Sequence, residues 1–258
     1  MNLTFINSLQ SEWLKKRHTA AAWIILICAF FMPLFILVIR LTSYDNTYQE
    51  ASNTHIWQVM HYRNWVAMGM FLLPLTLILF TSLITNIEYK NNTWKQIHTT
   101  PQSFTTIFFV KLMVIMGMVL QLFLLFNLGI YLSTIIPSLV YKGIPFPLEP
   151  FPFIKYLKSS LYFFIDCLPV LALQYLLSLR FKNFLVSIGI GFALLVVSLL
   201  SLNWKYGYIV PYIYLPLNFE ENQNYVDQSV NRHLCALGYF VLITGLNYFL
   251  YIFKKEKG

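Results

Sequence analysis

Six long apolar runs, separated by polar segments, constrain this chain more than any other feature. A transmembrane helix needs about 20 mostly apolar residues, and six segments meet that requirement. They are residues 20–39, 65–85, 112–136, 160–179, 184–202 and 234–253. Only 11% of the 258 residues are charged, against about 25% in a typical soluble domain. The sequence therefore predicts an all-α, polytopic integral membrane protein with a single transmembrane domain over residues 1–258.

The distribution of basic residues predicts the orientation of these spans. If the N-terminus is cytoplasmic, the cytoplasmic segments hold eleven basic and three acidic residues, and the rest of the chain holds seven of each. Positive residues mark the cytoplasmic side of a membrane protein, and an even number of spans places both termini there. Because the basic residues gather at the ends of apolar runs, the net charge of +8 does not indicate a nucleic-acid partner.

Two long segments then lie outside the cell. Residues 137–158 contain four prolines and are expected to be stiff and extended rather than helical. Residues 203–233 are rich in tyrosine, which favours the membrane interface. This second segment is either an ordinary interfacial loop or a segment that dips back into the outer leaflet.

The N-terminus has an amphipathic pattern. Phe5, Ile6, Leu9 and Trp13 recur at helical spacing, with polar residues between them. This pattern predicts a helix over residues 1–18 that lies in the inner interface of the membrane, although a frayed start is the alternative. The candidate residues of this interfacial helix are Glu12, Trp13 and Lys15.

Few residues inside the spans could support chemistry. Asp166 is the only acidic residue well inside a span, and such a residue marks a functional site by default, with helix packing as the equally weighted alternative. Gln121, Asn127 and Gln174 are scattered polar residues that more often link helices than bind a substrate. Neither a catalytic constellation nor a metal-binding spacing is found, and the three cysteines are read as core residues.

The polar segment 86–111 is much longer than a connection between neighbouring spans requires. It opens with Glu88, carries Trp94 and Lys95 at its centre and breaks at Pro101. Its central part is typical of a short helix lying along the membrane surface. The chain contains no Gly-x-x-x-x-Gly-Lys-Ser/Thr loop, so it lacks this route to ATP binding.

The whole layout resembles the permease subunits of type-2 ABC exporters. It is most similar to the small permeases of bacterial lantibiotic self-immunity transporters, which protect cells against peptide antibiotics. The residue-level match covers about residues 5–17 and 86–111, together with Trp65 at the start of the second span. Tyr89 and Lys90 stand where the family usually carries a Gly or another small residue after the Glu.

The resemblance implies a role for each of these segments. Residues 5–16 would be the connecting helix, and residues 91–98 a cytoplasmic coupling helix that docks in a cleft of a separate ATPase. The implied coupling residues are Glu88, Asn92, Thr93, Trp94, Lys95, Gln96, His98 and Pro101. The partners would be two copies of an ABC ATPase, a second permease that is identical or homologous, and membrane lipids. ATP and magnesium would bind the ATPase, and this chain would hold no cofactor.

The resulting expectation is a non-catalytic permease in a bacterial cytoplasmic membrane. It would move a hydrophobic or amphipathic substrate outward, such as a peptide, a lipid or a drug. The alternative is an ATP-independent channel or secondary transporter, although such proteins usually carry several intramembrane charges or inverted repeats. An intramembrane enzyme is a third possibility, against which the missing catalytic constellation argues.

Overall fold

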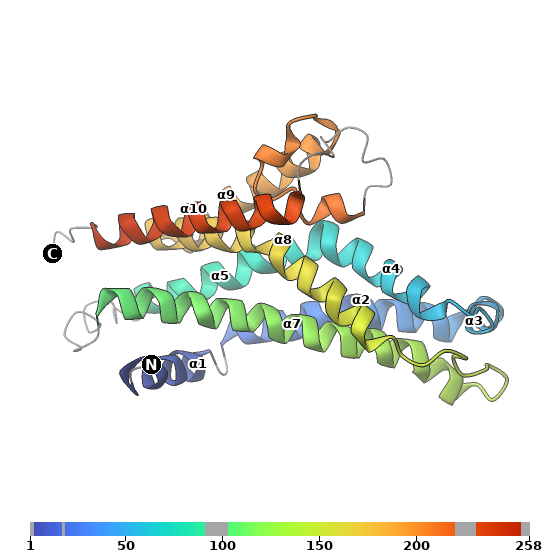
Figure 1. The fold of residues 1–258 in the computed structure, drawn as a ribbon. Helices are drawn as coiled ribbons and strands as arrows, with labels where there is room; N and C mark the ends of the chain where they lie inside the picture. The colour runs from blue at the N-terminus through green and yellow to red at the C-terminus, as the bar shows by residue number, and fades with distance from the viewer. Residues whose placement is uncertain (1–2, 17–18, 91–102, 220–230, 254–258) are drawn as a thin grey trace.

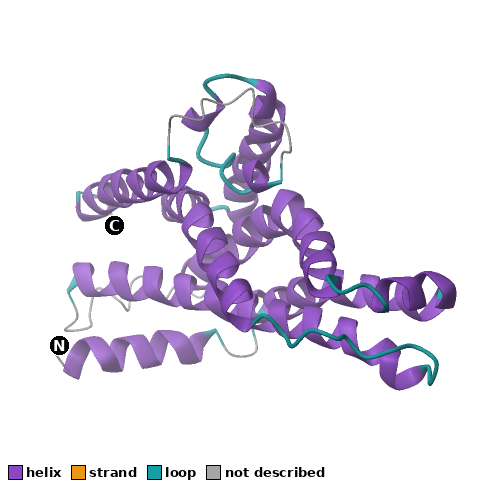
Figure 2. Ribbon diagram, turned by 45° about the vertical axis from the view of Figure 1, so that its right-hand side comes forward, coloured by secondary structure: helices purple, strands orange, loops and turns teal. Residues whose placement is uncertain are grey.

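The computed structural model describes residues 3–16, 19–90, 103–219 and 231–253. All regular structure in these ranges is helical (Figure 2). Six helical stretches are long and apolar enough to cross a membrane, which confirms the predicted fold class. They are α2 (Ala20–Thr42), the continuous stretch of α4 (Ile56–Ala67), η1 (Met68–Leu72) and α5 (Leu73–Lys90), then α7 (Phe104–Val140), α8 (Phe153–Arg180), α9 (Phe184–Leu200) and α10 (Arg232–Ile252). The shorter elements are α1 (Leu3–Lys15), α3 (Tyr44–Ala51), η2 (Ser201–Asn203), η3 (Gly207–Ile209) and η4 (Pro216–Asn218).

Polar side chains cap the N-terminal ends of three of these helices. The Ser103 hydroxyl accepts a hydrogen bond from the backbone N–H of Thr106 and starts α7, eight residues before the predicted span. Asn183 and Asn231 cap α9 and α10 in the same way. The expectation of an extended segment over residues 137–158 is wrong at both ends. Pro137 lies inside α7, α8 begins at Phe153, and residues 141–152 alone are non-helical there.

The ends of the helices separate into two groups at opposite ends of the bundle (Figure 1). The helix α1, the C-terminal end of α5, the N-terminal end of α7 and the C-terminal end of α10 lie at one end. The helix α3 and the segment 141–152 lie at the other end. The arrangement places the N-terminal helix near the two helix ends that flank residues 91–102.

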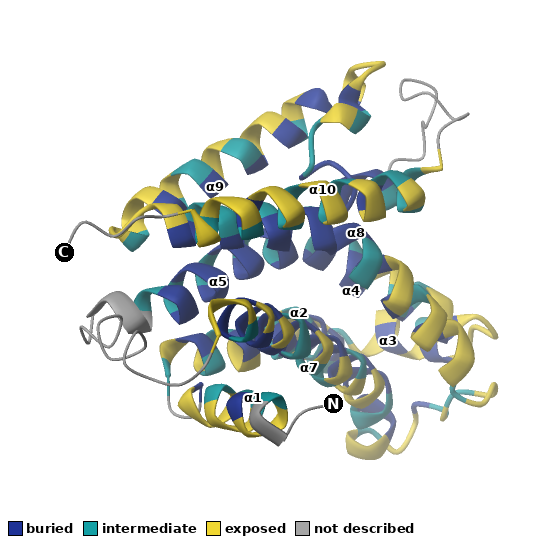
Figure 3. Cartoon of the chain, turned by 60° about the vertical axis from the view of Figure 1, so that its left-hand side comes forward, coloured by how far each residue is buried: buried dark blue, intermediate teal, exposed yellow. Residues whose placement is uncertain are grey.

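The inner and outer helices differ in how much of their surface the protein covers. In the most apolar window of each span, 61% of residues are buried in the second, third and fourth spans, and only 17% in the first and last. Figure 3 shows the buried residues on the sides of the helices that face one another. Trp65, on α4, stacks on Phe163 of α8 with ring centroids 4.0 Å apart. The exposed apolar surfaces of α2 and α10 suit contact with lipid or with another helix.

The segment that follows α9 enters the bundle rather than remaining at its surface. Tyr212, Ile213, Tyr214 and Leu215 are all fully buried. The Tyr214 hydroxyl donates to the backbone carbonyl of Tyr208 at 2.6 Å, which closes the segment on itself. The described part of this segment therefore packs between helices, an arrangement that neither alternative from the sequence specified.

Candidate functional site

The implied coupling surface lies almost wholly outside the described residues. Glu88 is in the last turn of α5. The remaining coupling candidates are outside the described ranges, and they are Asn92, Thr93, Trp94, Lys95, Gln96, His98 and Pro101. Their roles therefore remain predictions from the sequence. The described structure places the two helix ends that these residues connect, which are the C-terminal end of α5 and the N-terminal end of α7.

The N-terminal helix is packed tightly on α7. An added Cβ at Gly117 of α7 would lie 2.9 Å from Cζ3 of Trp13, so a larger residue there would require the indole to shift. Beside it, Glu12 and Lys15 form an ion pair one turn apart on α1. Trp13 therefore packs α1 against α7, and Gly117 is the residue of α7 that it contacts. The sequence pattern did not reveal Gly117.

Lys16 strengthens the same attachment. Its Nζ donates to Oε1 of Gln121 on α7 at 2.7 Å and lies 3.0 Å from the centroid of the Trp13 ring. Burial lowers the pKa of the Lys16 ammonium to about 8, while the aromatic ring favours its charged form. Gln121, predicted as an intramembrane polar candidate, thus binds the end of α1 rather than another span.

Gln174 is the centre of a buried network that joins four parts of the chain. Its Nε2 donates to the hydroxyls of Ser82 on α5 and Ser187 on α9, at 2.8 and 2.9 Å. Its Oε1 accepts from the hydroxyl of Tyr212 at 3.1 Å. Ser178, one turn along α8, bonds to the same two serines. In this arrangement each polar group of the network has a partner, which is what a helix interface inside a membrane requires.

Asp166 lies at a second junction. Its Oδ2 accepts from Nδ2 of Asn218 in η4 at 2.8 Å, and its Oδ1 lies 2.7 Å from Nδ1 of His233 on α10. The carboxylate is fully buried, and Tyr162 stacks on the His233 ring with centroids 4.8 Å apart. The carboxylate therefore ties α8 to α10 and to the inserted segment. Neither partner was predicted, because each is more than fifty residues away in sequence.

Asn127 joins α7 to α8. Its Nδ2 donates to the Ser160 hydroxyl at 2.8 Å and to the backbone carbonyl of Phe123. Asn127 and Ser160 also line an apolar cavity of about 550 Å³ between these two helices. Three of the four predicted intramembrane polar residues thus link spans to one another or to the inserted segment, and the fourth, Gln121, links α7 to the end of α1.

One charged cluster, formed by Arg40, Glu50 and Arg63, was not predicted as a site. Glu50 pairs with both arginines, and Arg40 is buried at the end of α2. The only signal in the sequence is a basic residue immediately after an apolar run, which is common in membrane proteins and therefore weak.

The polar clusters of the described residues are held together by hydrogen bonds and ion pairs. Within the described ranges, no group of three or more His, Cys, Asp or Glu residues could hold a metal ion. Cys28, Cys167 and Cys235 are free thiols. The polar clusters inside the bundle can therefore hold helices in register and present polar groups to a ligand.

A comparison with known protein families identifies the architecture. The family model for the ABC-2 family transporter protein matches residues 8–198, from within α1 to near the end of α9. No curated protein and no solved structure shows a significant match to the chain. Because the match covers most of the six-span architecture, the chain belongs to the ABC-2 family, whose members are membrane components of ABC transporters.

Proposed function

We propose that this chain is the permease subunit of an ATP-driven exporter that moves a hydrophobic or amphipathic substrate outward. The family supports a permease that works with an ABC ATPase. The absence of a phosphate-binding loop from the sequence agrees with ATP hydrolysis on that separate partner. A peptide, a lipid and a drug are all compatible with the apolar interior, and peptide-antibiotic immunity is the role that the sequence resemblance favours.

The polar segment 86–111, which includes the end of α5 and the start of α7, is the observation that carries the proposal. Segment 86–111 connects two spans of an ABC-2 protein, and the helix ends that flank it lie at the same end of the bundle as α1 (Figure 1). A partner that binds this segment could act on two spans at once, and α1 would respond through its contact with α7. ATP-driven movement of the ATPases would in this way change the packing of the permease.

The proposed assembly contains two permeases and two ATPase subunits in a bacterial cytoplasmic membrane. The second permease is either identical or homologous. Both termini face the cytoplasm, because this orientation collects the excess of basic residues on that side. ATP and magnesium bind to the ATPase subunits, and the spans contact membrane lipids directly.

Trp94 provides the test, because it is the only large aromatic residue among the predicted coupling positions 91–98. Buried aromatic anchors often contribute about 2 kcal/mol or more to an interface. We expect Trp94→Ala to reduce ATPase co-purification and to lose transport while the spans remain folded. Trp204→Ala is the control, since Trp204 is an exposed tryptophan beyond α9, outside the predicted coupling segment.

Two results would contradict this proposal. Normal co-purification and normal transport by Trp94→Ala would show that the coupling surface lies elsewhere. Substrate movement by vesicles that contain this chain without any ATPase would support the channel or secondary transporter instead.

A further inference from the structure

A cavity of about 790 Å³ lies between α2, α3 and α4, at the end of the bundle opposite to α1. One part of its wall is apolar and follows α2 through Met32, Phe35, Ile36 and Ile39. The other part is polar and is formed by the end of α2, by α3 and the residues beside it, and by Arg63 in the second half of α4. Its polar lining residues are Arg40, Ser43, Asn46, Thr47, Gln49, Glu50, Asn53 and Arg63.

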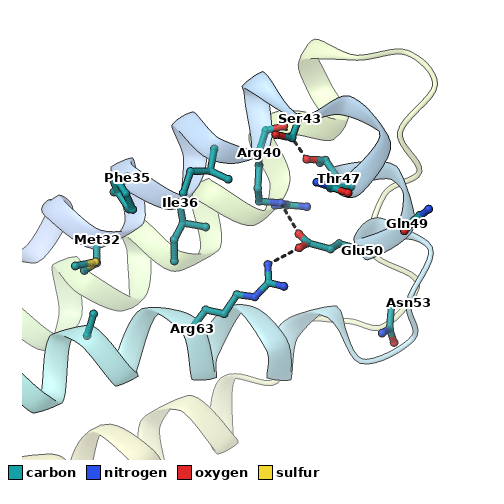
Figure 4. A pocket seen from close by; sticks show the side chains of 13 residues that line it. Met32, Phe35, Ile36, Arg40, Ser43, Thr47, Gln49, Glu50, Asn53 and Arg63 are labelled. Atoms are coloured by element: carbon teal, nitrogen blue, oxygen red, sulfur yellow. Dashed lines mark hydrogen bonds and ion pairs between the residues drawn. The ribbon is translucent and has the colours of Figure 1, made fainter.

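The polar part of this cavity carries an excess of positive charge. Glu50 lies between Arg40 and Arg63 and pairs with both, so that the three side chains together carry one net positive charge (Figure 4). Arg40 is only 2% exposed, and its Nη1 donates to the backbone carbonyls of Ser133 and Thr134 on α7. This anchoring holds the guanidinium in place at the edge of the cavity.

Some N–H groups of the same cluster lack a hydrogen bond. Nη2 of Arg40 is buried without a hydrogen-bond partner in the described structure, and Nε faces Oε2 of Glu50 at 3.5 Å without forming a hydrogen bond. Arg63 uses Nη1 for Glu50, and its side chain is 49% exposed. A buried guanidinium with unpartnered N–H groups is costly, whereas an oxyanion that accepts from two arginines would satisfy them, bidentately where the geometry allows. The cluster is therefore suited to a ligand with a phosphate or carboxylate group.

The apolar wall has the dimensions of a lipid chain rather than of a small soluble anion. Met32, Ile36 and Arg40 share one side of α2, because they are spaced four residues apart. From Met32 to Arg40 the helix rises about 12 Å, close to the roughly 15 Å hydrocarbon depth of one leaflet. Phe35 and Ile39, beside this line, are about half exposed. A chain lying here would place its headgroup at the arginines.

We propose that this cavity binds one anionic phospholipid from the leaflet that surrounds this end of the bundle. The phosphate accepts hydrogen bonds from Arg63 and Arg40, and one acyl chain lies along α2 between Met32 and Ile39. Glu50 holds the two arginines in place and limits the site to a single net positive charge. The site therefore prefers a lipid with one net negative charge, such as phosphatidylglycerol, over zwitterionic phosphatidylcholine.

Native mass spectrometry of the purified chain with equal amounts of phosphatidylglycerol and phosphatidylcholine tests the proposal. We expect one phosphatidylglycerol to be retained preferentially. Because a basic residue near a membrane surface attracts an anionic lipid by about 1 kcal/mol, Arg63→Gln should weaken this retention about fivefold. Lys155→Gln is the matched control, since it removes an exposed positive charge at the same end of the bundle and outside the cavity.

A second variant tests the apolar wall without changing any charge. Ala67 lines the cavity on α4, and Ala67→Leu should fill part of the space and also reduce lipid retention. Glycerol phosphate and inorganic phosphate serve as competitors that lack an acyl chain, and neither should displace the lipid at an equal concentration. Thermal unfolding in detergent should show that both variants remain folded.

Three results would overturn the proposal. Retention equal to wild type in Arg63→Gln, or an equal loss in Lys155→Gln, would remove the specific role of the cluster. Displacement of the lipid by inorganic phosphate would indicate a site for a soluble anion. Unchanged lipid retention in Ala67→Leu, together with dissociation of a permease dimer, would show that a second copy of the chain covers this side of α2.

Discussion

The Gln174 network and the Arg40–Glu50–Arg63 cluster are both polar groups packed among apolar helices, yet they differ in how their hydrogen-bonding capacity is used. Gln174 binds groups from α5, α9 and the inserted segment, so the network is closed. The arginine cluster carries a net charge, borders a cavity and keeps unpartnered N–H groups. The first arrangement stabilises one packing of the helices, and the second is available to a ligand. We therefore expect substitutions in the Gln174 network to lower stability, and substitutions in the arginine cluster to reduce ligand binding.

The largest expected effect on stability is at Gln174. Gln174→Leu removes four hydrogen bonds, and interhelical hydrogen bonds in membranes contribute about 0.6 kcal/mol each. We expect a loss of about 2 kcal/mol in the free energy of unfolding, measured by denaturation in mixed micelles. Gln58→Leu is the control, because Gln58 is exposed on α4. An equal effect in both variants would show that the network does not stabilise the bundle.

The contrast also shows what the sequence could predict. Asp166 and Gln174 were recognised as candidates because a polar residue inside an apolar run is conspicuous by itself. Their partners were not, because Tyr212, His233 and Asn218 come from distant parts of the chain that are polar or interfacial in composition. A local pattern identifies a group that needs a partner, but only the packing of the helices supplies one.

The six spans were predictable for a related reason. The length of an apolar run reports directly on a helix that crosses a membrane. Helix ends were less predictable, since α4 begins nine residues before Trp65 in a sequence that mixes polar and aromatic residues. Arg40 was missed because its burial depends on α3 folding back across the end of α2, and the Thr47 hydroxyl bonds to the Arg40 carbonyl there. Nothing in the run before Arg40 predicts that turn.

Asp166 has hydrogen-bond partners, as Gln174 does, and an ionisable side chain, as the arginines do. Its substitutions should show which of the two clusters it resembles. Asp166→Asn can keep hydrogen bonds to Asn218 and His233, because an amide both donates and accepts. We therefore expect it to retain assembly and transport. Asp166→Leu removes both contacts, while Nδ2 of Asn218 keeps its bonds to backbone carbonyls, and the variant should cost about 1 kcal/mol of stability.

Transport assays on the assembled complex separate the two roles of Asp166. Loss of transport in a stable, well-assembled Asp166→Asn complex would show that the carboxylate acts on a substrate or a proton. It would then belong with the ligand-binding type of cluster rather than with the Gln174 network.

Lys16 should give a smaller effect, which depends on pH. Burial lowers its pKa in the folded protein to about 8 from an ordinary value of 10.5. The unfolded chain therefore binds more protons than the folded chain between these values, and stability should rise as the pH increases from about 8 towards 10.5. We expect a gain of about 2 °C or less in the unfolding midpoint between pH 7.5 and 9.5, relative to Lys16→Met.

Lys15→Met is the control for this measurement, since Lys15 is half exposed on the same helix and pairs with Glu12. If Lys16→Met shows the same pH dependence as wild type, Lys16 is not the titrating group. In that case the contact between α1 and α7 depends on Trp13 and Gly117 rather than on the lysine.

The smallest expected effect on stability is at Arg63, and this substitution best distinguishes a ligand-binding cluster from a structural one. Its side chain is half exposed, and exposed ion pairs contribute about 0–1 kcal/mol. Arg63→Gln should therefore change the free energy of unfolding by no more than about 0.5 kcal/mol in lipid-free detergent. Arg40→Gln should cost more, because Arg40 is buried and its guanidinium donates to two carbonyls of α7. If added phosphatidylglycerol stabilises wild type but not Arg63→Gln, the cluster contributes through its ligand. A large loss of stability in Arg63→Gln without lipid would instead place this cluster beside the Gln174 network, as a structural tie between helices.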